Sequence, residues 1–271
     1  MSIDPGGEMG RPWPRRTPEV GVVIAVLVLA GSGSPVLAQE SEPPEWAFEG
    51  EVGASVLFGA SNQTTVAVRV AADRRAAGFE LENDLSFLYG EAKAEDGRSF
   101  VNKRSWIGEV QLDYLPGGNW SPFVLGSVEG SLERKIERRY AGAAGVRWTP
   151  LDEDGRKFDL AGGAKAARTT PKVEVGEVAD TETIGRLYTR GELVWPLGEN
   201  LAFSLVTTYE PDFSDFNNYT VGVDTGIQFN FNSSIALKLS LLDRYDSSAK
   251  SRGALSNNDG RLFFSIIAGV S

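Results

Sequence analysis

The feature that most constrains this chain is an alternation of apolar and polar residues with period two, repeated from Trp46 to the C-terminus. In "IALKLSLL", for example, Leu237 and Leu239 flank Lys238, and in "RLFFSIIAGV" Phe264 and Ile266 flank Ser265. Such a period places successive side chains on opposite faces of a β-strand. Turn residues separate the stretches, of which there are about twelve, each about ten residues long.

The apolar faces of these stretches carry no charge, which favours a membrane over water. An even number of strands is typical of single-chain outer-membrane barrels, and about ten residues span a membrane when a strand is tilted. The connections also alternate between short ones ("DRRA", "PGGN", "PLGEN", "NFNS") and longer ones ("EAKAEDGR", "TTPKVEVGEVADTE", "SSAKSRGALSNN"). "TPLDEDGR" is expected to be a longer turn on the short side. We therefore predict an all-β fold, a single antiparallel up-and-down transmembrane barrel of about twelve strands over residues 47–271.

Three tryptophans stand beside the short turns. Trp148 and Trp195 precede such turns, and Trp120 follows one. An indole ring has an apolar body and a polar N–H, so it is stable where hydrocarbon meets water. We predict that these rings form an aromatic girdle at the periplasmic interface.

The first 38 residues have the organisation of a secretory signal peptide. Arg11, Arg15 and Arg16 precede the apolar run "VGVVIAVLVLAG", and the small-residue exit "SGSPVLAQE" predicts cleavage after Ala38. Residues 39–46 are expected to form a linker. The predicted location of the mature protein is the bacterial outer membrane, with membrane lipid, the barrel-assembly machinery and small solutes or ions as expected partners.

Charges of both signs occupy the polar faces, and in a barrel these faces line the interior. Opposite charges can pair there, so the interior is either filled by its own side chains or left as a narrow pore. The residues predicted to line it are Arg69, Glu109, Arg139, Arg147, Asp159, Lys165, Arg186, Arg190, Glu192, Asp224, Lys238 and Arg261.

Two segments carry a resemblance to a known family. The opening "WAFEGEVGASVLFGASNQTT" and the closing "LSLLDRYDSSAKSRGALSNNDGRLFFSI" resemble the salt-induced outer-membrane proteins, whose domain is of unknown function. In the closing segment an Arg-Tyr-Asp element leads through a loop to an Asp that opens the final strand. The resemblance covers the chain from Trp46 onward and implies an outer-membrane barrel, without catalytic residues to transfer.

Enzymatic chemistry finds little support in the sequence. The chain has no histidine and no cysteine, which removes Ser-His hydrolytic arrangements and His or Cys metal sites. We predict no catalytic residue, cofactor or metal, and the formal charge of −10 argues against nucleic acid. A non-enzymatic envelope protein with a structural or small-solute pore role is therefore expected. The alternatives are a soluble periplasmic or secreted β-barrel or sandwich that binds a ligand, and an enzyme that uses carboxylates alone.

Overall fold

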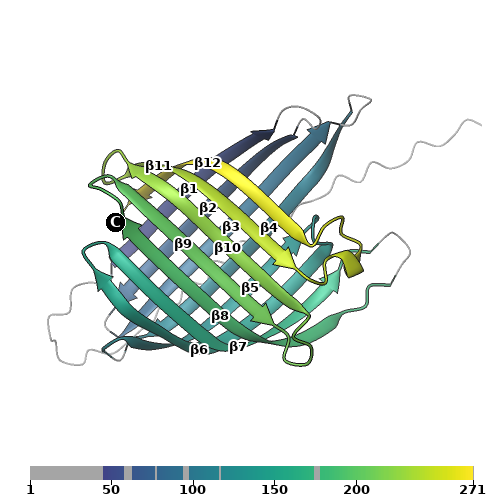
Figure 1. Cartoon of the computed structure of the whole chain (residues 1–271), viewed down its shortest axis with the longest axis horizontal. Helices are drawn as coiled ribbons and strands as arrows, with labels where there is room; N and C mark the ends of the chain where they lie inside the picture. The colour runs from purple at the N-terminus through teal and green to yellow at the C-terminus, as the bar shows by residue number, and fades with distance from the viewer. Residues whose placement is uncertain are drawn as a thin grey trace, which may run out of the picture. The chain divides into compact units, whose positions relative to one another are not determined.

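The computed structural model describes residues 45–57, 63–76, 78–93, 98–115, 117–173 and 178–270. These residues form one closed barrel of twelve antiparallel strands, shown in Figure 1. The strands are β1 (Glu45–Leu57), β2 (Gln63–Ala76), β3 (Phe79–Lys93), β4 (Ser99–Tyr114), β5 (Trp120–Ser131), β6 (Ile136–Glu153), β7 (Arg156–Pro171), β8 (Glu182–Pro196), β9 (Leu201–Pro211), β10 (Tyr219–Asn230), β11 (Ile235–Asp246) and β12 (Asn258–Val270). A single 3₁₀ turn, η1 (Lys250–Arg252), is the one helical element of this part of the chain. No helix in the described residues is long and apolar enough to span a bilayer.

Each strand pairs with its neighbours in sequence, and β1 pairs with β12 to close the sheet. Closure satisfies the backbone N–H and C=O groups of both edges, which a strand in hydrocarbon requires. The predicted fold class is confirmed.

The connections define two ends of the barrel. The tight-turn end contains residues 78, 115, 117–119, 154–155, 197–200 and 231–234, together with the start of β1 and the end of β12. The long-loop end contains residues 98, 132–135, 172–173, 178–181, 212–218 and 247–257.

The connection between β6 and β7 differs from the expectation. "TPLDEDGR" was expected to be a longer turn, and this was wrong, because the strands continue to Glu153 and resume at Arg156. Asp154 and Gly155 have φ values of 52° and 72°. Two positive φ values match the twist of a two-residue hairpin turn. The sequence hid the strand because its register shifts between Trp148 and Leu151.

The first strand begins at Glu45. Two residues of the segment expected to be a linker, Glu45 and Trp46, are therefore strand. The expected signal peptide and the rest of that segment, residues 39–44, lie outside the described residues.

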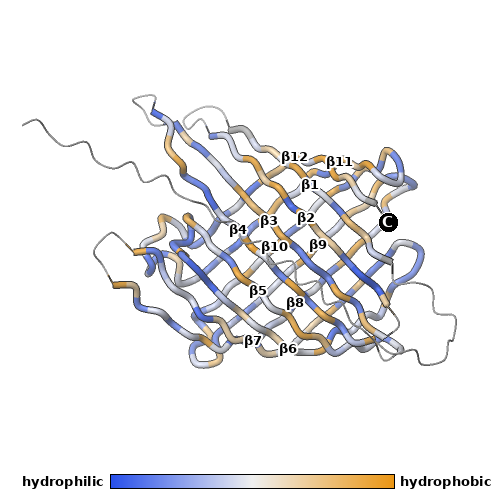
Figure 2. Tube along the Cα trace, turned by 180° about the vertical axis from the view of Figure 1, so that it is seen from behind, coloured by the Kyte–Doolittle hydropathy of each residue, from blue (hydrophilic) through white to orange (hydrophobic). Residues whose placement is uncertain are grey.

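The apolar face of the sheet points outward. In β12, Phe264 is 70% exposed whereas its neighbour Phe263 is 3% exposed, and Figure 2 shows the alternation of hydropathy along the strands. The exposed apolar side chains include Phe48, Val52, Val66, Val68, Val70, Leu85, Phe87, Val110, Val124, Leu160, Ile227, Leu237, Leu239, Leu241, Leu262 and Ile266. A soluble barrel or sandwich with its apolar face inside does not match this arrangement.

Aromatic rings gather at both ends of the barrel. At the tight-turn end, Trp120 stacks on Trp148 with ring centroids 5.8 Å apart, and the guanidinium of Arg156 lies 5.1 Å from the ring centroid of Trp195. At the long-loop end, the ring of Tyr219 lies 5.9 Å from that of Tyr209 and 5.4 Å from that of Tyr245. Clusters of aromatic rings therefore lie at both ends of the apolar band.

Candidate functional site

The interior of the barrel contains networks of ion pairs and side-chain hydrogen bonds. Arg147 on β6 lies 3.2 Å from Glu82 on β3, although two strands separate β3 from β6. A side chain can make that contact only over the inner face of the sheet. Similar contacts occur at three levels along the barrel.

At the tight-turn end, a chain of ion pairs runs from β3 to β8. Arg147 binds Asp113 at 2.5 Å and approaches Asp159 at 3.9 Å. Lys157 continues the chain to Asp159 at 3.2 Å and to Glu192 at 3.5 Å. Asp113 is fully buried, and its Oδ2 accepts from Gln111 at 2.8 Å and from Arg147, which offsets part of the cost of burying the charge.

At mid-height, contacts cross the interior between distant strands. Arg190 on β8 lies 4.0 Å from Glu109 on β4, and Lys165 on β7 binds Glu210 on β9 at 2.7 Å. An apolar cluster lies beside them and consists of Phe123, Leu125, Ala143 and Tyr188. Phe123 and Tyr188 pack with their ring centroids 5.7 Å apart. The interior at this height is therefore occupied by side chains.

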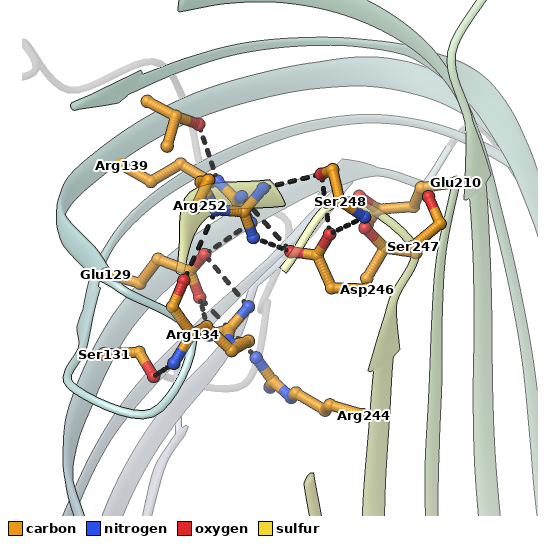
Figure 3. Close-up of polar contacts among 12 residues, drawn as sticks. Glu129, Ser131, Arg134, Arg139, Glu210, Arg244, Asp246, Ser247, Ser248 and Arg252 are labelled. Atoms are coloured by element: carbon orange, nitrogen blue, oxygen red, sulfur yellow. Dashed lines mark hydrogen bonds and ion pairs between the residues drawn. The ribbon is translucent and has the colours of Figure 1, made fainter. Parts of the chain in front are cut away.

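At the long-loop end, one buried carboxylate lies close to three arginines, as Figure 3 shows. Glu129 on β5 lies 2.7 Å from Arg134, 2.8 Å from Arg139 and 3.7 Å from Arg244. Arg139 also approaches Asp246, at 3.7 Å. We call Glu129, Arg134, Arg139, Arg244, Asp246 and Arg252 the arginine network.

The connection between β11 and β12 is tied into this network through η1. Arg252 binds Asp246 at 2.5 Å and donates to the hydroxyl of Ser248 at 2.6 Å. It also donates to the backbone carbonyl of Arg134 at 3.3 Å. One side chain thereby links the 247–257 loop to the 132–135 turn across the barrel mouth.

Charges outside the strands at this end have shifted pKa values. Burial alone would lower the pKa of Arg134, but the carboxylate of Glu129 outweighs burial and raises the pKa above its ordinary value. In the 212–218 loop, hydrogen bonds from Ser214 and Asn218 hold the pKa of Asp212 below its usual range. Both groups are therefore charged near neutral pH.

A cavity of about 120 Å³ borders the arginine network and is lined there by Glu129, Arg134 and Arg244. Glu51 faces it and accepts from Ser265 at 2.5 Å, with Lys238 at 3.9 Å. Asp224 also lines the cavity. Arg244 has 43% of its side chain exposed although Glu129 is its partner, so its guanidinium borders the open space.

The residues predicted to line the interior differ in whether they form ion pairs. Ion pairs with described residues are made by Arg69, Glu109, Arg139, Arg147, Asp159, Lys165, Arg190, Glu192, Lys238 and Arg261. Arg186 instead donates to the carbonyl of Glu210 at 3.0 Å and to Thr220 at 2.8 Å. Asp224 makes no ion pair with any described residue.

Sequence reasoning missed the centre of the arginine network. Glu129 lies on β5, where the inward neighbours Phe123 and Leu125 are apolar and obscure the alternation. Arg134 and Arg252 lie in connections, where a period of two carries no information. Asp246 was within reach, because it belongs to the Arg-Tyr-Asp element of the closing segment.

The described residues hold no group of three or more carboxylate, histidine or cysteine side chains placed to bind a metal ion. Glu80, Glu82 and Asp84, carboxylates of the kind that an enzyme without histidine could use, lie along one strand. Glu82 and Asp84 face arginines, which suits structural ion pairing.

Fold and interior together define a class: a closed up-and-down barrel with an apolar outer band and an ion-paired interior. A family model described as "Protein of unknown function, DUF481" matches residues 50–270. The chain belongs to that family. No match is found among curated protein sequences.

Several solved outer-membrane proteins are similar to this chain. The translocator domain of autotransporter NalP from Neisseria meningitidis is 9% identical, with 83% of this chain and 87% of that chain covered and a TM-score of 0.44. The NanC porin is 12% identical, with 84% of this chain and 100% of that chain covered and a TM-score of 0.46. The COG4313 outer membrane channel from Pseudomonas putida F1 is 11% identical, with 87% of this chain and 97% of that chain covered and a TM-score of 0.45. The class of protein stated above rests on the family match and on the closed barrel.

Proposed function

We propose that this protein is a non-enzymatic barrel of the bacterial outer membrane that restricts passage to water and small ions or solutes. Residues 1–38 direct secretion and are removed, and the barrel-assembly machinery inserts residues 47–271. The proposal includes membership of the salt-induced outer-membrane proteins, which the opening and closing segments resemble. The tight-turn end faces the periplasm, because short turns occupy that side of such barrels.

The observation that carries the location is the outer surface. A band of exposed Val, Leu, Ile and Phe side chains lies between the aromatic clusters at the two ends. In water such a continuous band would drive aggregation, whereas in a bilayer it is the surface that hydrocarbon contacts. Trp120, Trp148 and Trp195 then lie at the periplasmic headgroups.

The observation that supports restricted passage is the interior. Ion pairs between non-neighbouring strands, such as Arg190 with Glu109 and Arg147 with Glu82, place side chains over the inner face. Near the long-loop end, Arg252 ties the 247–257 loop to the 132–135 turn. Removing this link should widen the entrance without disturbing the barrel wall.

Conductance in a planar bilayer tests the proposal. The mature wild-type protein should insert and show small or rare openings. Arg252→Ala should increase conductance at least several-fold, because its contacts to Asp246, Ser248 and the carbonyl of Arg134 are lost. Lys250→Ala, in the same 3₁₀ turn, is the control, because no described ion pair involves that side chain. A wild-type conductance of porin size would contradict restriction, and failure to insert would contradict the location.

A further inference from the structure

A pair of arginines on the outer face has a different environment from the interior charges. Arg138 on β6 and Arg168 on β7 both lie at the long-loop end and are exposed. Arg138 pairs in register with Thr170, and Tyr140 pairs with Arg168, so the two arginines are diagonal neighbours. Tyr140 is 52% exposed and points outward. Arg138 lies two residues before Tyr140 in β6 and therefore on the same face of the sheet.

Within the described residues, Arg138 and Arg168 make no side-chain hydrogen bond and no ion pair. Like charges on neighbouring strands repel each other, and a cation on the outer face of a membrane barrel is destabilising unless it lies near the interface. Interior arginines such as Arg147 have carboxylates within 4 Å, whereas no described carboxylate lies that close to the guanidinium of Arg138 or Arg168.

The pair borders a groove. It has a volume of about 290 Å³ and is lined by Glu137, Arg138, Tyr140, Arg168 and Thr170. Glu137 is the extra residue of a register shift between Ile136 and Arg138, and it forms no ion pair with either arginine. The groove therefore offers two guanidinium forks and two hydroxyl groups, which match the oxygens of a phosphate.

Below the groove, the outer face of β6 and β7 carries small residues. Gly142 pairs with Ala166 and Ala144 with Ala164, and all four are exposed. Packing does not demand the small residue at Gly142, because a Cβ there would meet only the carbonyl of Leu125, at 3.9 Å. A shallow track thus runs from the two arginines into the apolar band, where an acyl chain can lie.

We infer that Arg138 and Arg168, with the track formed by Gly142, Ala144, Ala164 and Ala166, bind a phosphate-bearing lipid of the leaflet at the long-loop end. The phosphate neutralises both guanidinium groups, and one acyl chain fills the track. This inference rests on the proposed membrane location. It assigns the lipid contact to one side of the barrel, and so predicts a lipid bound at a fixed place rather than a uniform annulus.

Native mass spectrometry of the mature protein in neutral detergent tests the inference. The probes are phosphatidic acid and a diacylglycerol with the same acyl chains, which lacks only the phosphate. Wild type should retain phosphatidic acid in preference to diacylglycerol. Arg138→Gln with Arg168→Gln should weaken that retention by about 30-fold, the effect of removing two interfacial cations.

Two further variants make the result specific. Arg74→Gln with Arg156→Gln removes two arginines at the tight-turn end, where they lie over Trp46 and Trp195, and retention should be unchanged. Gly142→Leu fills the track and should weaken phosphatidic acid while both arginines remain. Unchanged binding in the Arg138/Arg168 variant, or equal retention of diacylglycerol, would overturn the inference.

Two controls separate this inference from the proposed function. Heat-modifiable gel mobility of every protein reports whether the barrel has folded. A folded, inserted barrel without phosphate-dependent lipid retention overturns the lipid site alone, whereas a wild-type chain that never inserts overturns the proposed function. If inorganic phosphate displaces phosphatidic acid at equal concentration, the site takes free phosphate and the lipid assignment is wrong.

Discussion

Glu129 should be the carboxylate on which the barrel depends most. Its side chain is 8% exposed and has three arginines at 2.7, 2.8 and 3.7 Å. Glu129→Gln keeps the shape of the side chain and removes its charge, which leaves Arg134, Arg139 and Arg244 close together with less compensation. Removing one partner of a buried ion pair costs about 3–5 kcal/mol, and we expect a loss within that range.

The measurement is equilibrium urea unfolding of the mature protein in detergent micelles, followed by tryptophan fluorescence. Asp224→Asn is the matched control: Asp224 lines the same cavity but forms no ion pair with the described residues, so its loss should stay below about 1 kcal/mol. Adding Arg134→Gln to Glu129→Gln should restore part of the stability, because one uncompensated cation is then removed. Equal losses in the Glu129 and Asp224 variants would refute the reasoning.

Three further perturbations address the outer surface and a loop. Leu239→Arg places a cation in the middle of the outward apolar band and should lower the free energy of unfolding in lipid by about 2–4 kcal/mol; an unchanged value would count against lipid contact there. Trp195→Lys puts a second cation beside Arg156, which lies 5.1 Å from the ring centroid, and should reduce the heat-modifiable fraction after refolding into vesicles; full insertion would contradict the girdle. Asp212, whose pKa is lowered chiefly by the Ser214 hydroxyl, stabilises its loop above the ordinary carboxyl pKa of about 4 and loses this effect only as the pH falls below it. Pepsin cleavage within 212–218 should therefore rise below about pH 4 in wild type and show no such step in Asp212→Asn; a step near pH 6 would refute the assignment.

The sequence predicted the wall of the barrel well and its contents less well. Alternation put Leu237, Leu239 and Leu241 on one apolar face. The uncharged apolar faces, the alternating loop lengths and the tryptophans beside the turns then predicted that this face points outward, as it does. The same alternation assigned Lys238 to the opposite face.

Partner choice could not be read from the alternation. Arg147 reaches Glu82 across two intervening strands, and this depends on side-chain length and barrel curvature rather than on residue order. Arg134 and Arg252 lie in connections and enter the interior because those connections fold inward. The tight Asp154–Gly155 turn was hidden for a related reason: a register shift moved its flanking residues out of phase.

The central claim is that the outer face contacts hydrocarbon, and spin-label accessibility along β11 tests it most directly. The chain contains no cysteine, so each single-cysteine variant from Leu237 to Leu242 carries one label. In vesicles, labels at positions 237, 239 and 241 should be accessible to apolar oxygen, and labels at 238, 240 and 242 should not. Equal accessibility of all six to a water-soluble nickel chelate, or the reverse alternation, would contradict a barrel whose apolar face lies in the membrane.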